Sequence, residues 1–242
     1  MFVPLLAMPG FSGMSDLSNP LVIRQILIEM IALILSIAVH EFGHAFVADR
    51  LGDRLPRSQG RVTLNPIAHI DLLGTIVIPL ASAVFGVRLL GWGKPVQTSA
   101  RASFLGRRMS TRTADLLISL AGPGMNLLIA AALSIVFALL LHLGFAEIAP
   151  DRVTPLVPYY VEMVIGLNIG LAIFNLIPLP PLDGRSVLFW FLPSGHPIVR
   201  FLEQYGPFIF IALFATGILS IVMAPAGWLI SAWLDLLHRW TP

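Results

Sequence analysis

The chain has 242 residues, a formal net charge of +2, 57% hydrophobic and only 12% charged residues, and a mean hydropathy of +0.86. A soluble domain has about 45–50% apolar and about 25% charged residues, so this composition excludes a soluble globular enzyme, a disordered chain and a nucleic-acid-binding domain. Cysteine is absent, which excludes a disulfide framework and leaves His, Asp and Glu as the ligands of any transition metal.

Four stretches are long and apolar enough to cross a bilayer as helices, which takes about 20 residues each. The first 20 residues lack a basic n-region and are interrupted by proline and glycine, so we expect them outside the membrane or at its surface and not as a signal peptide. We expect a kink at Pro225 in the last span. The predicted spans are approximately 21–47, 114–143, 160–182 and 205–236.

The basic residues set the predicted orientation. Of the 15 Lys and Arg, 12 lie in the segments 49–113 and 184–204, which the positive-inside rule places in the cytoplasm. The N-terminus, the loop 144–159 and the C-terminus are then outside, and the protein is a multi-pass protein of the cell membrane. The shorter apolar stretch 72–90 has basic flanks on both sides. We therefore expect it to re-enter from the cytoplasmic face without crossing, lined by protein or by a water-filled cavity.

The motif HEFGH at residues 40–44 lies near the cytoplasmic end of the first span. His40 and His44 share one face of a helix, so both imidazoles can bind one ion, and Glu41 lies beside them as a candidate general base. Ionisable residues inside a membrane are costly and usually functional, which favours a metal site over a buried polar cluster. The active site is therefore predicted toward the cytoplasmic side.

A catalytic zinc site usually has three protein ligands, and Asp183 is the candidate for the third. It lies in NLIPLPPLDGR (175–185), where three prolines prevent a regular helix. The alternative, an incidental Asp at a helix C-terminus, is disfavoured by the helix dipole. Spans one and three must run in the same direction for these residues to meet, and one crossing between them, with 72–90 re-entrant, satisfies this condition.

These motifs resemble the site-2 protease family of intramembrane zinc metalloproteases (peptidase family M50), in its compact prokaryotic branch without a PDZ or CBS domain. The resemblance covers about residues 21–205. It implies that His40, His44 and Asp183 bind one zinc ion per chain, that Glu41 is the catalytic base and that Asn175 contacts substrate. The matching motifs are HEFGH, AGPGMN (121–126), NLIPLPPLDG (175–184), NPIAHIDLLGT (65–75) and GWGKPV (91–96).

The expected fold is a single all-α polytopic membrane domain over 1–242, with a catalytic core at about 21–205 and a C-terminal transmembrane helix at about 205–236. The expected function is hydrolysis of peptide bonds in or near transmembrane segments of membrane-protein substrates, by zinc-activated water with Glu41 as base. The alternatives are an ion transporter or channel, and an inactive zinc-binding scaffold. No nucleic-acid partner is expected, and the sequence leaves the oligomeric state open.

Two motifs have open interpretations. The segment 55–64 contains a turn signal at Gln59-Gly60, so it is either a small β-hairpin that pairs with extended substrate near the active site or an ordinary basic loop. His69 and Asp71 are expected to form a hydrogen-bonded loop, with a second metal site as the alternative.

The motif AGPGMN lies in the second span. Its Gly122, Pro123 and Gly124 are expected to allow close packing of helices, because small residues let membrane helices approach one another. Asn126 is expected to hydrogen-bond within the core, with lining of the site as the alternative.

Overall fold

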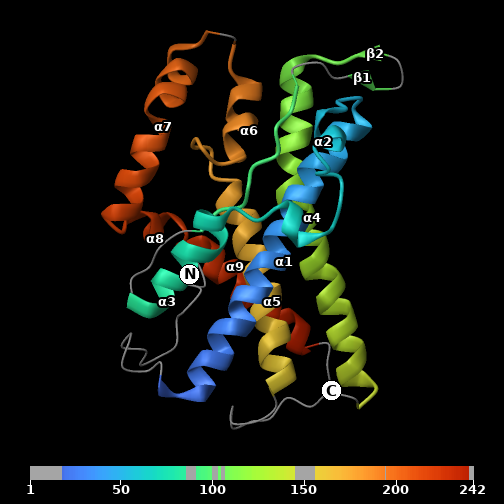
Figure 1. The fold of residues 1–242 in the computed structure, drawn as a ribbon, viewed down its shortest axis with the longest axis vertical. Coiled ribbons are helices and arrows are strands. Elements are labelled where there is room, and N and C mark those ends of the chain that lie inside the picture. Colours follow the sequence, from blue (N-terminus) through green and yellow to red (C-terminus); the bar gives the residue numbers. More distant parts are fainter. Residues whose placement is uncertain are drawn as a thin grey trace.

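A computed structural model describes residues 18–85, 91–99, 103–104, 107–144, 156–193 and 195–239. The predicted extracytoplasmic segment at the N-terminus lies almost entirely outside these residues. The long helices are α1 (Pro20–Arg50), α4 (Thr111–His142), α5 (Leu156–Asn175), α7 (Pro197–Ala215) and α9 (Ala224–Arg239) (Figure 1). The short helices are α2 (Leu55–Ser58), η2 (Pro66–Ala68), η3 (Leu72–Val77), α3 (Ile78–Phe85), α6 (Gly184–Phe191) and α8 (Ile218–Val222). Two antiparallel strands, β1 (Ser103–Phe104) and β2 (Arg107–Arg108), have two residues each.

The two longest helices begin at residues that satisfy their first free N–H groups. Asn19 precedes Pro20 at the start of α1, and its side chain accepts from the N–H of Leu21 at 2.9 Å. Ser110 precedes α4, and its hydroxyl accepts from the N–H of Thr113 at 3.1 Å. Ser and Asn are preferred at this position for this reason, so both helix starts follow from the local sequence.

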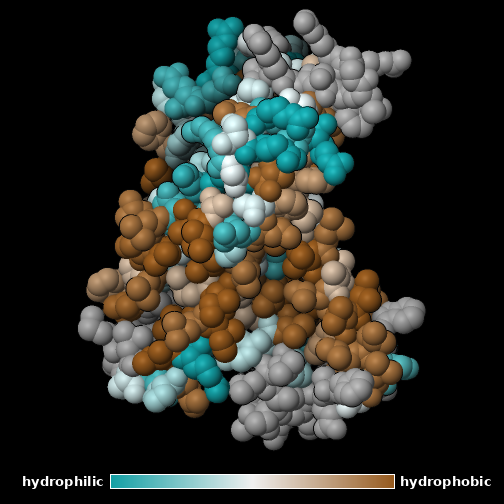
Figure 2. Space-filling view, turned by 45° about the vertical axis from the view of Figure 1, so that its right-hand side comes forward, coloured by the Kyte–Doolittle hydropathy of each residue, from teal (hydrophilic) through white to brown (hydrophobic). Residues whose placement is uncertain are grey.

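Helices α1, α4, α5 and α9 form the packed bundle. α1 packs against α4, α4 against α5, and α5 against α9. The largest buried cluster joins α4, α5 and α9, with Phe137 and Ile165 at 1% and 0% exposure. Large apolar side chains on the outside of these helices stay exposed, as Ile135 on α4 does at 69%. Figure 2 shows this hydrophobic surface over the middle and lower parts of the molecule, with hydrophilic residues gathered at the upper end.

Four stretches of the described residues are long and apolar enough to cross a bilayer. The predicted all-helical membrane fold with about four such helices is therefore confirmed, although their identities differ from the prediction. Helix α5, the expected third span, is not one of the four and ends at Asn175, seven residues before the predicted end. The four stretches are Pro20–Arg50, Thr111–His142, Pro197–Ala215 and Ile218–Arg239.

The prediction of one kinked helix over 205–236 is wrong. α7 ends at Ala215, and Gly217 follows with φ +74°, a left-handed conformation that terminates helices. Pro225 lies in the first turn of α9, where its missing N–H is harmless, two residues after the break at Met223 that separates α8 from α9. In Figure 1, α7 and α9 descend one after the other from the upper to the lower end of the molecule.

Of the two alternatives considered for 55–64, the β-hairpin is not what the structure has. Residues 55–58 are helix α2, which has Pro56 in its first turn. The turn that follows has Gly60 at φ +68°, and residues 61–64 form no strand. Proline at the start of a helix fixes the required φ, and this local preference outweighs the strand signal.

The apolar stretch predicted to re-enter the membrane forms η3 and α3, and the chain then returns to where the stretch began. The N–H of Trp92 donates to the carbonyl of Gly74 at 3.0 Å, and the Thr75 hydroxyl donates to the carbonyl of Trp92 at 2.8 Å. The two ends of the stretch therefore lie side by side, which is the geometry that a re-entrant segment requires.

Candidate metal centre

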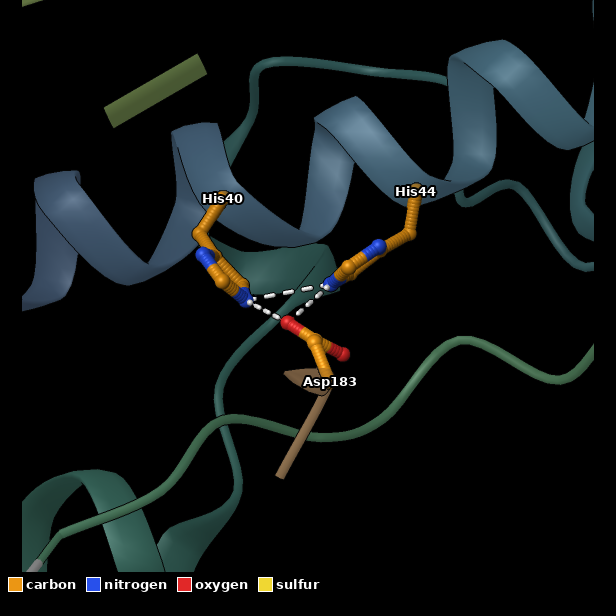
Figure 3. A group of neighbouring side chains, drawn as sticks. All are labelled: His40, His44 and Asp183. Atoms are coloured by element: carbon orange, nitrogen blue, oxygen red, sulfur yellow. Dashed lines mark hydrogen bonds and ion pairs between the residues drawn. The ribbon is translucent and has the colours of Figure 1, made fainter. Parts of the chain in front are cut away.

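Three side chains that are far apart in the sequence meet inside the bundle. His40 and His44 point from adjacent turns of α1 toward Asp183, which directly precedes α6 (Figure 3). Asp183 Oδ2 lies 3.1 Å from His40 Nε2 and 3.2 Å from His44 Nε2, and the two Nε2 atoms are 3.0 Å apart. Among the described residues, this is the group whose His and carboxylate atoms could hold a metal ion.

Hydrogen bonds from α4 hold both imidazole rings. His44 Nδ1 lies 2.7 Å from the backbone carbonyl of Ile118, and His40 Nδ1 lies 2.7 Å from Asn126 Oδ1. A carbonyl oxygen only accepts, so Nδ1 of each ring carries the proton and donates. Each Nε2 then presents a lone pair to the centre, which is the tautomer that ligates a metal.

The Asp183 Oδ2 atom is buried and has no hydrogen-bond donor among the described residues. Its neighbours at 3.1 and 3.2 Å are His40 Nε2 and His44 Nε2; with both rings in this neutral tautomer, three acceptors face one another. A buried arrangement of this kind is unfavourable unless a cation neutralises it. Tetrahedral zinc with bonds of about 2.0–2.1 Å separates its ligand atoms by roughly 3.3 Å. The observed 3.0–3.2 Å fits such an ion.

Two glycines make this approach of α1 and α4 feasible. A Cβ on Gly43 would lie 2.6 Å from the carbonyl oxygen of Ala121, so the helices touch backbone to backbone there. A Cβ on Gly122 would lie 2.4 Å from His44 Nε2 and 2.7 Å from His40 Cε1. Close packing was the predicted role of Gly122, and the structure shows that the rings of His40 and His44 pack against it.

Asp183 is held by the turn around it. Gly184 approaches the preceding loop so closely that a Cβ would lie 2.2 Å from the carbonyl oxygen of Leu176. In the first turn of α6, Ser186 accepts a hydrogen bond from the Ser119 hydroxyl on α4 at 2.9 Å, and both serines are buried. The segment that carries Asp183, the candidate third ligand, is therefore fixed to α4, the helix that also holds the two imidazoles.

The Glu41 carboxylate follows His40 on α1 and is 9% exposed. Its Oε2 atom accepts from the N–H of Val96 at 3.1 Å and lies 3.8 Å from the guanidinium of Arg61. Arg61 is 3% exposed and also donates to the carbonyls of Ala68 and Lys94. The buried guanidinium of Arg61 thus holds two loop segments next to Glu41 and faces the carboxylate of Glu41 with a positive charge.

His69 belongs to this loop and not to a second metal site. It is 1% exposed, and its Nε2–H donates to the carbonyl of Thr63 at 2.8 Å. Burial and, to a smaller extent, the nearby Arg61 charge lower the pKa of His69 below its ordinary value, so the ring is neutral. Asp71 accepts from the N–H of Gly74 at the start of η3. The prediction of a hydrogen-bonded loop is confirmed.

The remaining predicted site residue is Asn175, at the end of α5. Its side-chain amide donates to the carbonyl of Leu171 in the same helix at 2.9 Å, and its contact with substrate stays a prediction. Sequence reasoning missed the bond from Asn126 to His40 and the cradle around Glu41. A signal for Asn126 was present, because it lies four residues after Gly122 and therefore on the same face of α4.

Comparison with known proteins agrees with this geometry. Residues 28–158, more than half of the chain, match the model of peptidase family M50; the match includes HEFGH and ends before Asp183. A relative from Bacillus subtilis (strain 168) named "Putative zinc metalloprotease YwhC" is 37% identical over 197 residues, 81% of this chain and 84% of that protein. "Putative zinc metalloprotease Rip2" of Mycolicibacterium smegmatis (strain ATCC 700084 / mc(2)155) is 29% identical over 208 residues, 85% of this chain and 74% of that protein. No solved structure matches the chain significantly. The helical fold, the metal-type cluster and these matches agree, and the chain belongs to peptidase family M50.

Proposed function

We propose that this chain is an intramembrane zinc metalloendopeptidase that hydrolyses peptide bonds in or near transmembrane segments of membrane-protein substrates. The observation that carries the proposal is the meeting of three acceptor atoms, from His40, His44 and Asp183, without a donor inside a bundle with a hydrophobic outer surface. These residues would hold one zinc ion. Zinc, when bound, supplies a Lewis acid that activates water near neutral pH and polarises the scissile carbonyl.

Glu41 is the proposed general base. Its carboxylate accepts a proton from the attacking water, whose oxygen bonds to the scissile carbonyl carbon. The same proton then passes to the leaving nitrogen as the C–N bond breaks, which yields a carboxylic acid and an amine; transfer of the acid's proton to the amine leaves a carboxylate and an ammonium group. The N–H of Val96 holds Oε2 of this carboxylate, so the base is oriented before substrate arrives.

An extended segment beside Glu41 offers a place for the substrate backbone. In residues 91–99, the N–H groups of Trp92, Lys94 and Val96 donate to Gly74 O, His69 O and Glu41 Oε2 at 2.9–3.1 Å. Backbone groups of alternate residues in an extended chain point to opposite edges. The backbone groups at Gly93, Pro95 and Gln97 therefore form a second edge, which we call the free edge and which has no partner among the described residues.

A substrate peptide that pairs with the free edge is extended, as hydrolysis requires, and its carbonyls are no longer bonded within a helix. Gly93 contributes to the fit, because a Cβ there would lie 2.5 Å from Ile37 Cγ2 and 3.4 Å from Glu41 Oε1. The free edge thus takes the role that the sequence suggested for residues 55–64. We further propose that this end of the bundle faces the cytoplasm, as the positions of Lys and Arg indicate.

The test replaces the proposed base and leaves the metal ligands in place. Glu41→Gln keeps the size of the side chain but cannot take the water proton. General base action contributes about 10²–10⁴-fold, so cleavage should fall to background while the purified protein keeps one zinc per chain. Cleavage is measured by comparing new N-termini of membrane proteins in cells that produce either form. Uncleaved substrate should co-purify with the Glu41→Gln protein.

Glu29→Gln is the matched control. Glu29 is a buried carboxylate on the same helix, bonded to Gln25, and it lies 12 positions before Glu41, about 18 Å along the helix axis. Its substitution should leave both zinc content and cleavage unchanged. Undiminished cleavage by the Glu41→Gln protein would refute the role of Glu41. Ion flux through reconstituted protein without cleavage would favour the transporter alternative.

A further inference from the structure

A row of buried amides connects α5 to the metal centre through α4. Asn168 on α5 and Asn126 on α4 are both 0% exposed. Asn168 Nδ2 donates to Val164 O at 2.9 Å and to Ser36 Oγ at 3.0 Å. Asn126 Nδ2 donates to Asn168 Oδ1 at 2.9 Å and to Ser36 O at 3.1 Å. Asn126 Oδ1 then meets His40 Nδ1 at 2.7 Å.

The donor and acceptor in each of these hydrogen bonds can be assigned in turn, starting from the backbone carbonyl of Val164. Val164 O can only accept, so the Asn168 atom that faces it must be the amide nitrogen. The other end of Asn168 is then an oxygen, and the Asn126 atom that faces it must be a nitrogen. Asn126 consequently turns its own oxygen toward His40, and this oxygen needs a proton on Nδ1. The proton on Nδ1 leaves Nε2 of His40 free to bind a metal.

We infer that Asn168 is a positioning residue, which acts through Asn126 to keep His40 in its metal-binding tautomer. The inference rests on the proposed zinc site. Asn168 does not touch His40, and its contribution is to satisfy one of the two N–H groups of Asn126 while Ser36 O satisfies the other. Without Asn168, one buried N–H of Asn126 lacks an acceptor and one of the two bonds that orient the amide is lost.

The expected loss of zinc affinity depends on how directly each asparagine contacts His40. Replacement of an outer-shell partner typically lowers metal affinity 10–100-fold. Asn126 bonds to His40 itself, so Asn126→Leu should lower zinc affinity by up to about 100-fold, the upper end of this range. Asn168 supplies one of two bonds to Asn126, so Asn168→Leu should lower zinc affinity by about tenfold, the lower end of the range.

A conservative variant separates orientation from simple packing. Buried Asp in its neutral form has one O–H that can donate to Val164 O and one oxygen that can accept from Asn126. Asn168→Asp should therefore restore most of the zinc affinity that Asn168→Leu loses. Ser134→Ala is the control, because Ser134 is a buried polar residue on α4 that also donates to the carbonyl four residues earlier. It should bind zinc as tightly as the unaltered chain.

The experiment measures zinc affinity of the purified full-length chain in detergent, by competition with a chelator. A second readout is the ¹⁵N spectrum of histidine-labelled protein without metal, which shows whether His40 carries its proton on Nδ1. We expect Nδ1–H in the unaltered chain and in Asn168→Asp, and a mixture of tautomers in Asn168→Leu. A merely structural role for Asn168 would not move this signal.

Each outcome decides the matter. Equal zinc affinity of Asn168→Leu and the unaltered chain would overturn the inference and leave the proposed function intact. Equal loss of affinity in Asn168→Leu and Asn168→Asp would also overturn it, because the loss would then come from packing. Absence of zinc binding by the unaltered chain would overturn the proposed function, and the inference with it.

Discussion

The glycine opposite the two imidazoles gives a sharp test of the metal centre. In Gly122→Ala, the new methyl carbon would lie 2.4 Å from His44 Nε2, where ordinary contact begins at 3.4 Å. The ring must therefore retreat by about 1 Å, which is half the length of a zinc–nitrogen bond. Such a movement also stretches the 2.7 Å bond between His44 Nδ1 and the carbonyl of Ile118.

The helix itself should tolerate this change. Alanine stabilises a helix by about 0.5–1 kcal/mol relative to glycine, so α4 is expected to form at least as well. The zinc affinity should fall by more than the 10–100-fold that loss of an outer-shell partner costs, because the ligand atom itself is displaced. Gly122→Ala thus predicts a folded protein that has lost its metal.

Gly124→Ala provides the matched comparison. It makes the same substitution on the same helix two residues later, and a Cβ at Gly124 meets nothing within 4 Å. Zinc per chain is measured by elemental analysis of both purified proteins, and helix content by circular dichroism. If Gly122→Ala keeps as much zinc per chain as Gly124→Ala, the imidazoles do not lie against Gly122 and the geometry of the centre is wrong.

Two further predictions concern the loop around the base and the topology. Arg61→Met should keep zinc but lower cleavage, since it releases both loop segments that the guanidinium holds next to the Glu41 carboxylate. The control Arg57→Met removes an exposed guanidinium and should cleave normally. Equal cleavage by the two proteins would contradict the role of Arg61. Cysteines introduced singly at Ser58 and Ser103 should be labelled from the cytoplasm and one at Gly144 from outside, and labelling of Ser58 and Ser103 from opposite sides would show that the stretch 72–90 crosses the membrane.

The period of the α-helix was enough to predict one part of the site from the sequence. The spacing of His40 and His44 places both rings on one helix face whatever surrounds them. The match of Asp183 to this pair came from the direction of the spans and from the resemblance to a known family. The structure brings the three residues together as expected.

The parts that sequence did not predict depend on how the helices are rotated and translated against one another. Spacing along α4 cannot show that Asn126 Oδ1 reaches His40, or that the carbonyl of Ile118 reaches His44. Local preferences also competed in two places. A proline in the first turn favoured helix α2 where a hairpin was considered, and Gly217 divided the last predicted span where a proline kink was expected.

The order in which the ligands are synthesised limits when the centre can become active. His40 and His44 enter the membrane first, and two ligands fall short of the three that catalytic zinc needs. α4 then brings the groups that set both tautomers. Asp183 follows 139 positions after His44, roughly 7–28 s later at about 5–20 residues per second. Under the proposed function, a nascent chain would therefore be inert while its first helices insert, and it would not cleave neighbouring membrane proteins until the third ligand arrives.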